Sequence, residues 1–141
     1  MVVDDDTEQC RHLMANLKNI GVKKVLSATS GKEAFAMMNA QPRPVDLLLT
    51  DVQMSEGNGL QLLQAVRIGN IKGMRLNSTV VLATSAATVG IIQTASALDA
   101  NGFVVKPVSV DKFEAAILKA RRTIFPPSPK KHAEVYIPDE V

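Results

Sequence analysis

Short runs of β-branched residues and leucines alternate along the chain with longer stretches in which apolar residues recur every three or four positions. The short runs fall at residues 2–3, 24–28, 45–50, 79–84 and 103–105. They predict five strands, and the stretches between them predict helices. This alternation is typical of an α/β fold in which helices cover both faces of a doubly wound, five-stranded parallel sheet.

Local signals mark the beginnings of several helices. Ser30, followed three positions later by Glu33, is a capping-box pattern, so a helix is predicted to begin there and to bury Ala34, Phe35 and Met38. The helix before it has an acidic start, where Asp6 is placed to cap the first turn.

The fifth predicted helix has the most regular pattern in the chain. Ser109 can cap it, and apolar residues then step by three or four positions. They are Val110, Phe113, Ile117, Ala120 and Ile124. The fourth predicted helix, around residues 91–98, has fewer large apolar residues and includes Gly90 at its start. The fourth helix is therefore expected to be the easiest element to displace.

The composition changes after residue 124. Pro126, Pro127 and Pro129 cannot extend the preceding helix. The chain is therefore predicted to contain one domain at residues 1–124 and a proline-rich tail at residues 125–141. Two alternatives stay open for the tail, which either docks on the domain through residues 135–137 or forms a flexible end.

Length and composition narrow the functional class. The 141 residues suit a single domain, with 46% apolar and 21% charged residues. The net charge of +2 and the absence of Trp argue against a nucleic-acid-binding surface. Cys10 is the only cysteine, which favours a reducing cytoplasm, and no apolar run is long enough to span a membrane.

Polar residues follow the predicted strands at the point where each strand ends. Asp4 and Asp5 follow the first strand, Asp51 the third, Ser85 the fourth and Lys106 the fifth. Ligands of open parallel sheets bind at these carboxyl ends. Three neighbouring carboxylates repel one another unless a hard cation such as Mg²⁺ binds between them. A Lys ammonium and a Ser hydroxyl then suit the oxygens of a phosphoryl group.

These residues occur in motifs that resemble one known family. Val-Val-Asp-Asp at 2–5, the apolar strand ending at Asp51, Ser85-Ala86 and Lys106-Pro107 are similar to the receiver domains of two-component signalling. The resemblance covers about residues 1–124 and implies the flavodoxin-like (βα)5 fold. Each motif alone is weakly specific, whereas their order and spacing together are strongly specific.

The resemblance implies a role for each matching position. Asp51 corresponds to the phosphoacceptor, and Asp4 and Asp5 to the acidic pair that binds Mg²⁺ or another divalent cation. The backbone carbonyl of Gln53 would be a further metal ligand. Ser85 would bond a phosphoryl oxygen.

The resemblance also implies roles for a lysine and for an aromatic residue. Lys106 would form an ion pair with the phosphoryl group. The peptide bond between this lysine and the following Pro107 is commonly cis in the family. Phe103 occupies the aromatic switch position. The sequence departs from the family at Ser55, where a proline is usual, and at Asn58, where an aspartate is usual.

The resemblance also implies a function. The chain would accept a phosphoryl group on Asp51 from a sensor histidine kinase or a phosphotransfer protein, and would change shape to control a partner. It would be a signalling switch and no enzyme for a separate substrate. A homodimer through the fourth helix, fifth strand and fifth helix is one expected form of partner contact.

Three alternatives belong to other classes. A phosphatase or phosphotransferase that works through an aspartyl-phosphate needs a second acid two residues after the nucleophile, where this chain has Gln53. A flavodoxin-like cofactor binder needs a phosphate-binding first loop, and the aspartates at 4–6 would repel a phosphate. A degenerate receiver that only binds partners would not need all the chemical positions, which are filled here.

Overall fold

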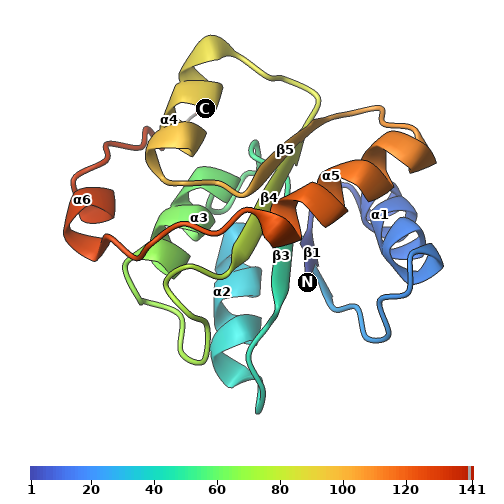
Figure 1. The fold of residues 1–141 in the computed structure, drawn as a ribbon, viewed down its shortest axis with the longest axis horizontal. Helices are drawn as coiled ribbons and strands as arrows, with labels where there is room; N and C mark the ends of the chain where they lie inside the picture. The colour runs from blue at the N-terminus through green and yellow to red at the C-terminus, as the bar shows by residue number, and fades with distance from the viewer. Residues whose placement is uncertain (140) are drawn as a thin grey trace.

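The computed structural model describes residues 1–139 and 141, and its centre is one sheet of five parallel strands (Figure 1). In chain order these are β1 (Val2–Val3), β2 (Ser27–Ala28), β3 (Leu47–Thr50), β4 (Thr79–Thr84) and β5 (Gly102–Val105). The spatial order is β2-β1-β3-β4-β5, and every neighbouring pair is parallel. The chain reverses its direction of winding after β2, which confirms the predicted doubly wound sheet.

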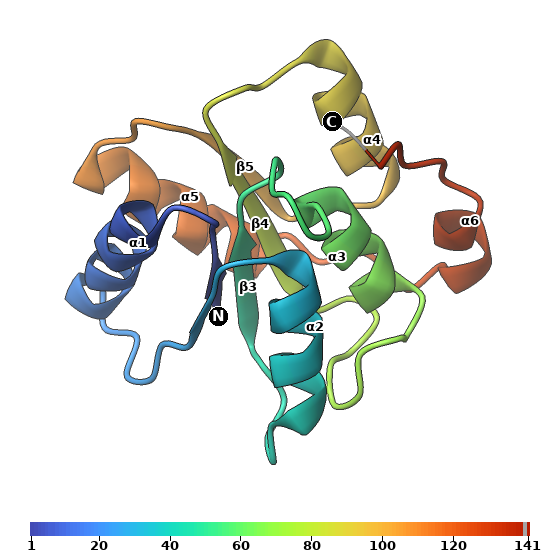
Figure 2. The ribbon, with the colours of Figure 1, turned by 180° about the vertical axis from the view of Figure 1, so that it is seen from behind.

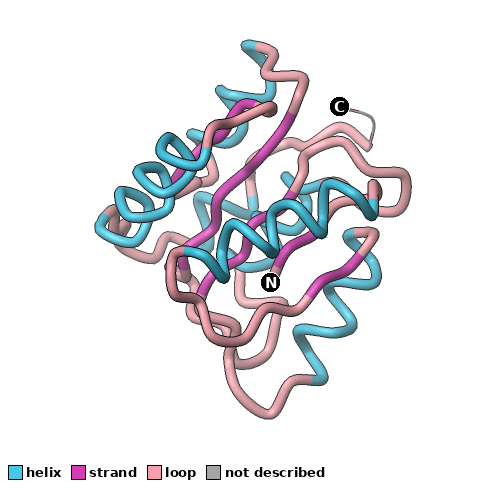
Figure 3. The backbone as a smooth tube through the Cα atoms, turned by 90° about the vertical axis from the view of Figure 1, so that its right-hand side faces the viewer, coloured by secondary structure: helices cyan, strands magenta, loops and turns pink. Residues whose placement is uncertain are grey.

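Five helices cover the two faces of this sheet, as the two opposite views show (Figures 1 and 2). One face carries α1 (Thr7–Asn19) and α5 (Val110–Arg122). The other carries α2 (Gly31–Ala40), α3 (Gly59–Arg67) and α4 (Val89–Ala97). Figure 3 shows the strands as short segments between these helices, with long loops at both ends of the sheet.

Alternation along the strands divides the core into two clusters. Val80 and Leu82 of β4 pack with α2, α3 and α4, whereas Val81 and Ala83 pack with α1 and α5. Successive side chains of a strand point to opposite faces, so a strand covered on both faces must be apolar at nearly every position. This requirement explains the nearly continuous apolar run at residues 79–84.

Two strands are shorter than predicted. Residues 24–26 and 45–46 lie outside β2 and β3. The reason is the length of β1, whose two residues pair with Ser27 and Ala28 on one side. On the other side, β3 begins where Leu47 meets Thr79, the first residue of β4. Strand length is set by pairing partners, which apolar patterning alone does not reveal.

One burial prediction is wrong, and two residues of the regular apolar pattern at 110–124 are exposed. Phe35 is 39% exposed, because the buried face of α2 runs through Ala34 and Met38 and leaves Phe35 at its margin. In α5, Val110 is half exposed at the first turn. Ile124 is 74% exposed, because α5 ends at Arg122 and the chain turns away from the sheet.

The predicted caps are present, with one change. Asp6 accepts hydrogen bonds from the backbone of the first turn of α1, and Ser109 caps α5. Ser30 caps α2, but the Glu33 carboxylate accepts from the backbone and hydroxyl of Thr29 and does not complete a capping box with Ser30. Ser30 therefore caps α2 as predicted, whereas Glu33 holds Thr29 instead of the backbone of Ser30.

The chain after α5 runs back across the α3 side of the molecule. It forms the short helix α6 (Pro129–Ala133) against α3 and continues toward α4, where the chain ends (Figure 2). His132 in α6 is 1% exposed, and Val135, Ile137 and Val141 pack against the α2–α3–α4 core. His132 is therefore part of the folded structure.

Arg67, at the end of α3, is a buried residue that no motif identified. Its guanidinium donates to the backbone carbonyls of Leu98, Leu76, Ser78 and Asp99 and to the side-chain oxygen of Asn101. Burial lowers the pKa of Arg67 to about 10, and Asp99 partly offsets this effect. The cation therefore joins the ends of α3 and α4 to the start of β4. No helix among the described residues is long and apolar enough to cross a membrane.

Candidate functional site

The carboxyl ends of β1, β3, β4 and β5 surround one open hollow. Every residue that the sequence predicted for phosphoryl or metal chemistry lines this hollow. These residues are Asp4, Asp5, Asp51, Gln53, Ser85 and Lys106. The parallel register brings them together, because strands that run the same way end at the same edge of the sheet.

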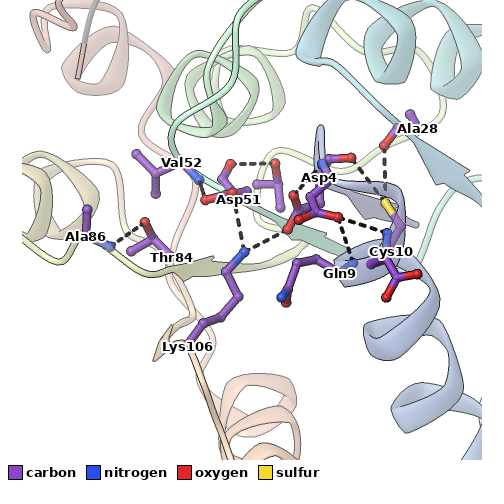
Figure 4. A network of polar contacts seen from close by, with 12 residues as sticks. Asp4, Gln9, Cys10, Ala28, Asp51, Val52, Thr84, Ala86 and Lys106 are labelled. Atoms are coloured by element: carbon purple, nitrogen blue, oxygen red, sulfur yellow. Dashed lines mark hydrogen bonds and ion pairs between the residues drawn. The ribbon is translucent and has the colours of Figure 1, made fainter.

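A lysine joins two carboxylates at the floor of this hollow (Figure 4). The Lys106 ammonium lies 2.7 Å from an Asp4 carboxylate oxygen and 3.4 Å from one of Asp51. Asp4 is 1% exposed, and its other oxygen accepts a hydrogen bond from the backbone of Asp6. The Cys10 thiol donates to the Asp4 carbonyl at 3.2 Å, which helps to fix the backbone of the acid.

One carboxylate oxygen of Asp51 accepts a backbone hydrogen bond, and the other faces the hollow. Its Oδ1 accepts from the Val52 backbone at 2.7 Å, while Oδ2 faces Lys106. Burial raises the pKa of Asp51, Lys106 lowers it and Asp4 raises it further. The net direction is upward, so the carboxylate is less stable as an anion than a solvated aspartate. A nearby cation would favour its charged, nucleophilic form.

The pKa of Lys106 is raised by its environment. Burial acts to lower this pKa, but the hydrogen bonds and charges of Asp4 and Asp51 together outweigh burial. The ammonium is therefore firmly protonated and supplies one positive charge against the carboxylates around it.

Three carboxylates of the site are arranged as a cation would need. One oxygen each of Asp4, Asp5 and Asp51 lies within 4.8 Å of the other two. Asp5 is exposed, so its side chain is free to turn toward a ligand. With three acids and one lysine, the cluster has an excess negative charge and its ligand atoms are all oxygens, which is the donor set that Mg²⁺ prefers.

The chain matches one known family over most of its length. The response regulator receiver domain family matches residues 1–118. The chain belongs to this family.

Two relatives are similar to this chain over most of its length. This chain is 30% identical over 118 residues to a probable chemotaxis protein CheY of Rhizobium etli, and the match covers 83% of this chain and 87% of that protein. It is 32% identical over 120 residues to the transcriptional regulatory protein ZraR of Escherichia coli, covering 85% of this chain. Only 25% of that relative is covered, so the receiver domain spans about a quarter of ZraR.

Solved structures show the same fold. A CheY-like receiver domain protein from Methanospirillum hungatei superposes with a TM-score of 0.72 at 21% identity, covering 86% of this chain and 90% of that one. CheY4 of Vibrio cholerae gives a TM-score of 0.71 at 23% identity, covering 84% and 94%. The flavodoxin-like receiver fold is thereby shown.

The loop after Asp51 in this receiver domain is fastened by backbone contacts. The backbone amides of Gly31 and Lys32 donate to the carbonyls of Gly57 and Glu56. Asn58 caps α3 in a reciprocal capping box with Gln61. The loop is therefore bound to α2 and α3 although Ser55 stands in place of the family's usual proline.

Gly59 allows α3 to approach the backbone of Asp51 closely. A Cβ at this residue would lie 2.1 Å from the backbone oxygen of Asp51, which no side chain can tolerate. The first turn of α3 therefore packs directly on the Asp51 backbone. The sequence showed the glycine but gave no signal for this contact, because the two residues meet only after the loop has folded.

Ser85 and Pro107 also line the hollow. Ser85 is exposed, and the Ala86 backbone beside it donates to the Thr84 hydroxyl. The Lys106–Pro107 bond is cis, as the resemblance implied. Phe103 is half-buried and packs against the α2–α3–α4 core.

Proposed function

We propose that Asp51 of this receiver domain accepts a phosphoryl group from a histidine kinase or phosphotransfer protein in the cytoplasm. The observation that carries the proposal is the convergence of Asp4, Asp5 and Asp51, whose oxygens lie within 4.8 Å, around one lysine. Family membership supplies the context, since receiver domains of this kind act in two-component signalling.

The residues present fit a divalent cation. Asp4, Asp5 and Asp51 would hold Mg²⁺ together with the backbone carbonyl of Gln53, which lines the same hollow. The ion would neutralise the carboxylates and the oxygens of the incoming phosphoryl group.

The chain's own groups then have separate roles in the transfer. Oδ2 of Asp51 attacks phosphorus, an O–P bond forms and the P–N bond of the phosphohistidine breaks. The imidazole leaves with the bonding electron pair and takes up a proton from water. Lys106 stabilises charge on the phosphoryl oxygens, and the exposed Ser85 hydroxyl donates to one of them.

The product is a signal, because the chain modifies only itself. Drawing Ser85 toward a phosphoryl oxygen would vacate space near α4, into which Phe103 can rotate. The elements α4, β5 and α5 each expose large apolar residues that suit contact with a partner or with a second copy of the chain. They are Val89, Ile92, Val105 and Val110.

Phosphorylation can be tested directly. Incubation with acetyl phosphate and Mg²⁺, followed by intact-mass measurement, should add one phosphoryl mass to the wild type and none to Asp51→Asn. Chelation of the divalent cation should prevent the addition. Modification of Asp51→Asn at the wild-type rate would show that the acceptor lies elsewhere.

The switch has its own test. Beryllofluoride, a phosphoryl mimic, should shift backbone NMR signals across residues 88–105 as well as those around Asp51. Light scattering of the same samples measures whether the exposed face forms a dimer. Signals that change only at Asp4, Asp5 and Asp51 would mean that the site does not communicate with α4.

A further inference from the structure

We propose that the end of the chain is a docked strap that restrains the loop after Asp51 and the end of α4. The strap comprises residues 129–139 and Val141. That the strap restrains these two segments follows from its contacts in the fold. Its effect on phosphorylation rests on the proposed function. The following contacts support this assignment.

The strap has an inner and an outer side. Val135 and Ile137 pack against the α2–α3–α4 core, together with Val141, whereas Tyr136 between them is 82% exposed. This alternation is that of an extended segment laid along an apolar surface. The strap therefore docks through apolar burial.

A ladder of carboxamides on α3 binds the polar atoms of the strap. Gln64 donates to the backbone carbonyls of His132 (3.0 Å) and Val135 (2.9 Å). Asn58 donates to the carbonyl of Pro138 at 3.2 Å, and Gln61 to the carboxylate of Asp139 at 3.3 Å. Residues 58, 61 and 64 are three apart, which places them on one face of the helix.

The two ends of the strap contact the end of α4 and the loop after Asp51. A phosphorylation switch would move both. At one end, His132 Nε2 lies 2.8 Å from a carboxylate oxygen of Asp99, just after α4. At the other, the Gln53 side chain donates to the Val141 carbonyl at 2.8 Å. Gln53 follows Asp51 by two residues, and its backbone carbonyl is one of the proposed metal ligands. The strap thus joins the site loop to the end of α4.

These contacts fit one arrangement of the domain. In that arrangement Ser85 is exposed, and Lys106 lies closer to Asp4 than to Asp51. Moving the Gln53 loop or the end of α4 would break contacts at an end of the strap. Docking therefore favours the present arrangement and opposes a rearrangement linked to phosphorylation, and the coupling is reciprocal.

The test uses the full chain and a pair of adjacent substitutions. Ile137→Asp places a charge on the inner side of the strap, and Tyr136→Asp places the same charge on the exposed side as its control. Hydrogen exchange is measured at residues 53–58 and 94–100. We expect Ile137→Asp to speed exchange there by about tenfold and Tyr136→Asp to leave it unchanged.

A second pair of substitutions tests the same contacts in case Ile137→Asp unfolds the domain. Gln64→Ala removes two bonds to the strap without altering its apolar residues, and Gln93→Ala, at an exposed position of α4, is the control. Gln64→Ala should speed exchange in the same regions, and Gln93→Ala should not. Unchanged exchange in both Ile137→Asp and Gln64→Ala would overturn the proposed restraint.

Coupling to the site is measured by titrating beryllofluoride in the presence of Mg²⁺. Release of the strap should tighten binding by about fivefold in Ile137→Asp, with no change in Tyr136→Asp. Equal affinity in the wild type and Ile137→Asp would overturn the coupling, whatever the exchange shows. Failure of the wild type to bind beryllofluoride would instead contradict the proposed function, and the exchange data alone would then decide the restraint.

Discussion

The Lys106 ammonium lies 2.7 Å from Asp4 and 3.4 Å from Asp51, so one cation serves two nearly buried carboxylates. Lys106→Met would leave both acids without this partner. We expect a loss of about 1–3 kcal/mol in the free energy of unfolding at neutral pH in chelator. Urea unfolding measures it.

The loss should depend on pH and on metal. Without Lys106 the pKa of Asp51 rises further, so Asp51 takes up its proton as the pH falls and the stability deficit of the variant shrinks. Saturating Mg²⁺ should also restore part of the lost stability. A variant as stable as the wild type in chelator would mean that solvent already screens the two carboxylates.

Asp51→Asn should not destabilise the fold in chelator. The pKa of Asp51 is raised above its ordinary value of 3.8, chiefly by burial. The folded state therefore binds this proton more tightly than the unfolded state, and the wild type loses stability as the pH rises through the raised pKa. The neutral amide avoids that loss. The variant should be at least as stable as the wild type at pH 7, with the gap closing as the pH falls toward 3.8.

Asp5 and Asp6 are adjacent but should behave differently. Asp5 is exposed and belongs to the acidic cluster, so Asp5→Ala should change stability in chelator by less than about 0.5 kcal/mol and abolish the stabilisation by Mg²⁺. Asp6 caps α1, so Asp6→Ala should cost about 1 kcal/mol and keep the response to Mg²⁺. Melting temperatures with and without Mg²⁺ distinguish the two. A large loss for Asp5→Ala in chelator would make Asp5 a structural residue.

Asp99 combines a left-handed backbone with a buried partner. Its φ is +54°, a conformation that asparagine and glycine accept more readily than most residues, and its carboxylate bonds His132. Asp99→Asn keeps an acceptor and suits the backbone, so stability should change by less than about 0.5 kcal/mol. Asp99→Ala leaves the buried His132 unpartnered and should cost about 2 kcal/mol in thermal unfolding. Equal melting temperatures of the two variants would show that the His132 contact contributes nothing.

Much of the fold and the composition of the site followed from local pattern. The nearly continuous apolar run at residues 79–84 indicated a strand buried on both faces, and alternation with helical stretches indicated the parallel sheet. Asp51 and Lys106 then had to meet, because parallel strands end at the same edge. Patterning carries this information because burial depends on which face each side chain occupies.

Contacts between distant segments could be decided only by the tertiary structure. The length of β2 depended on β1, and the exposure of Phe35 depended on which side of α2 met the sheet. The packing of Gly59 on the Asp51 backbone and the burial of His132 against Asp99 had no sequence signal. The sequence by itself determined the elements and the acidic site at their ends. Three-dimensional packing decided where the last residues lie, because a short apolar segment docks only where a folded surface already offers a complementary face.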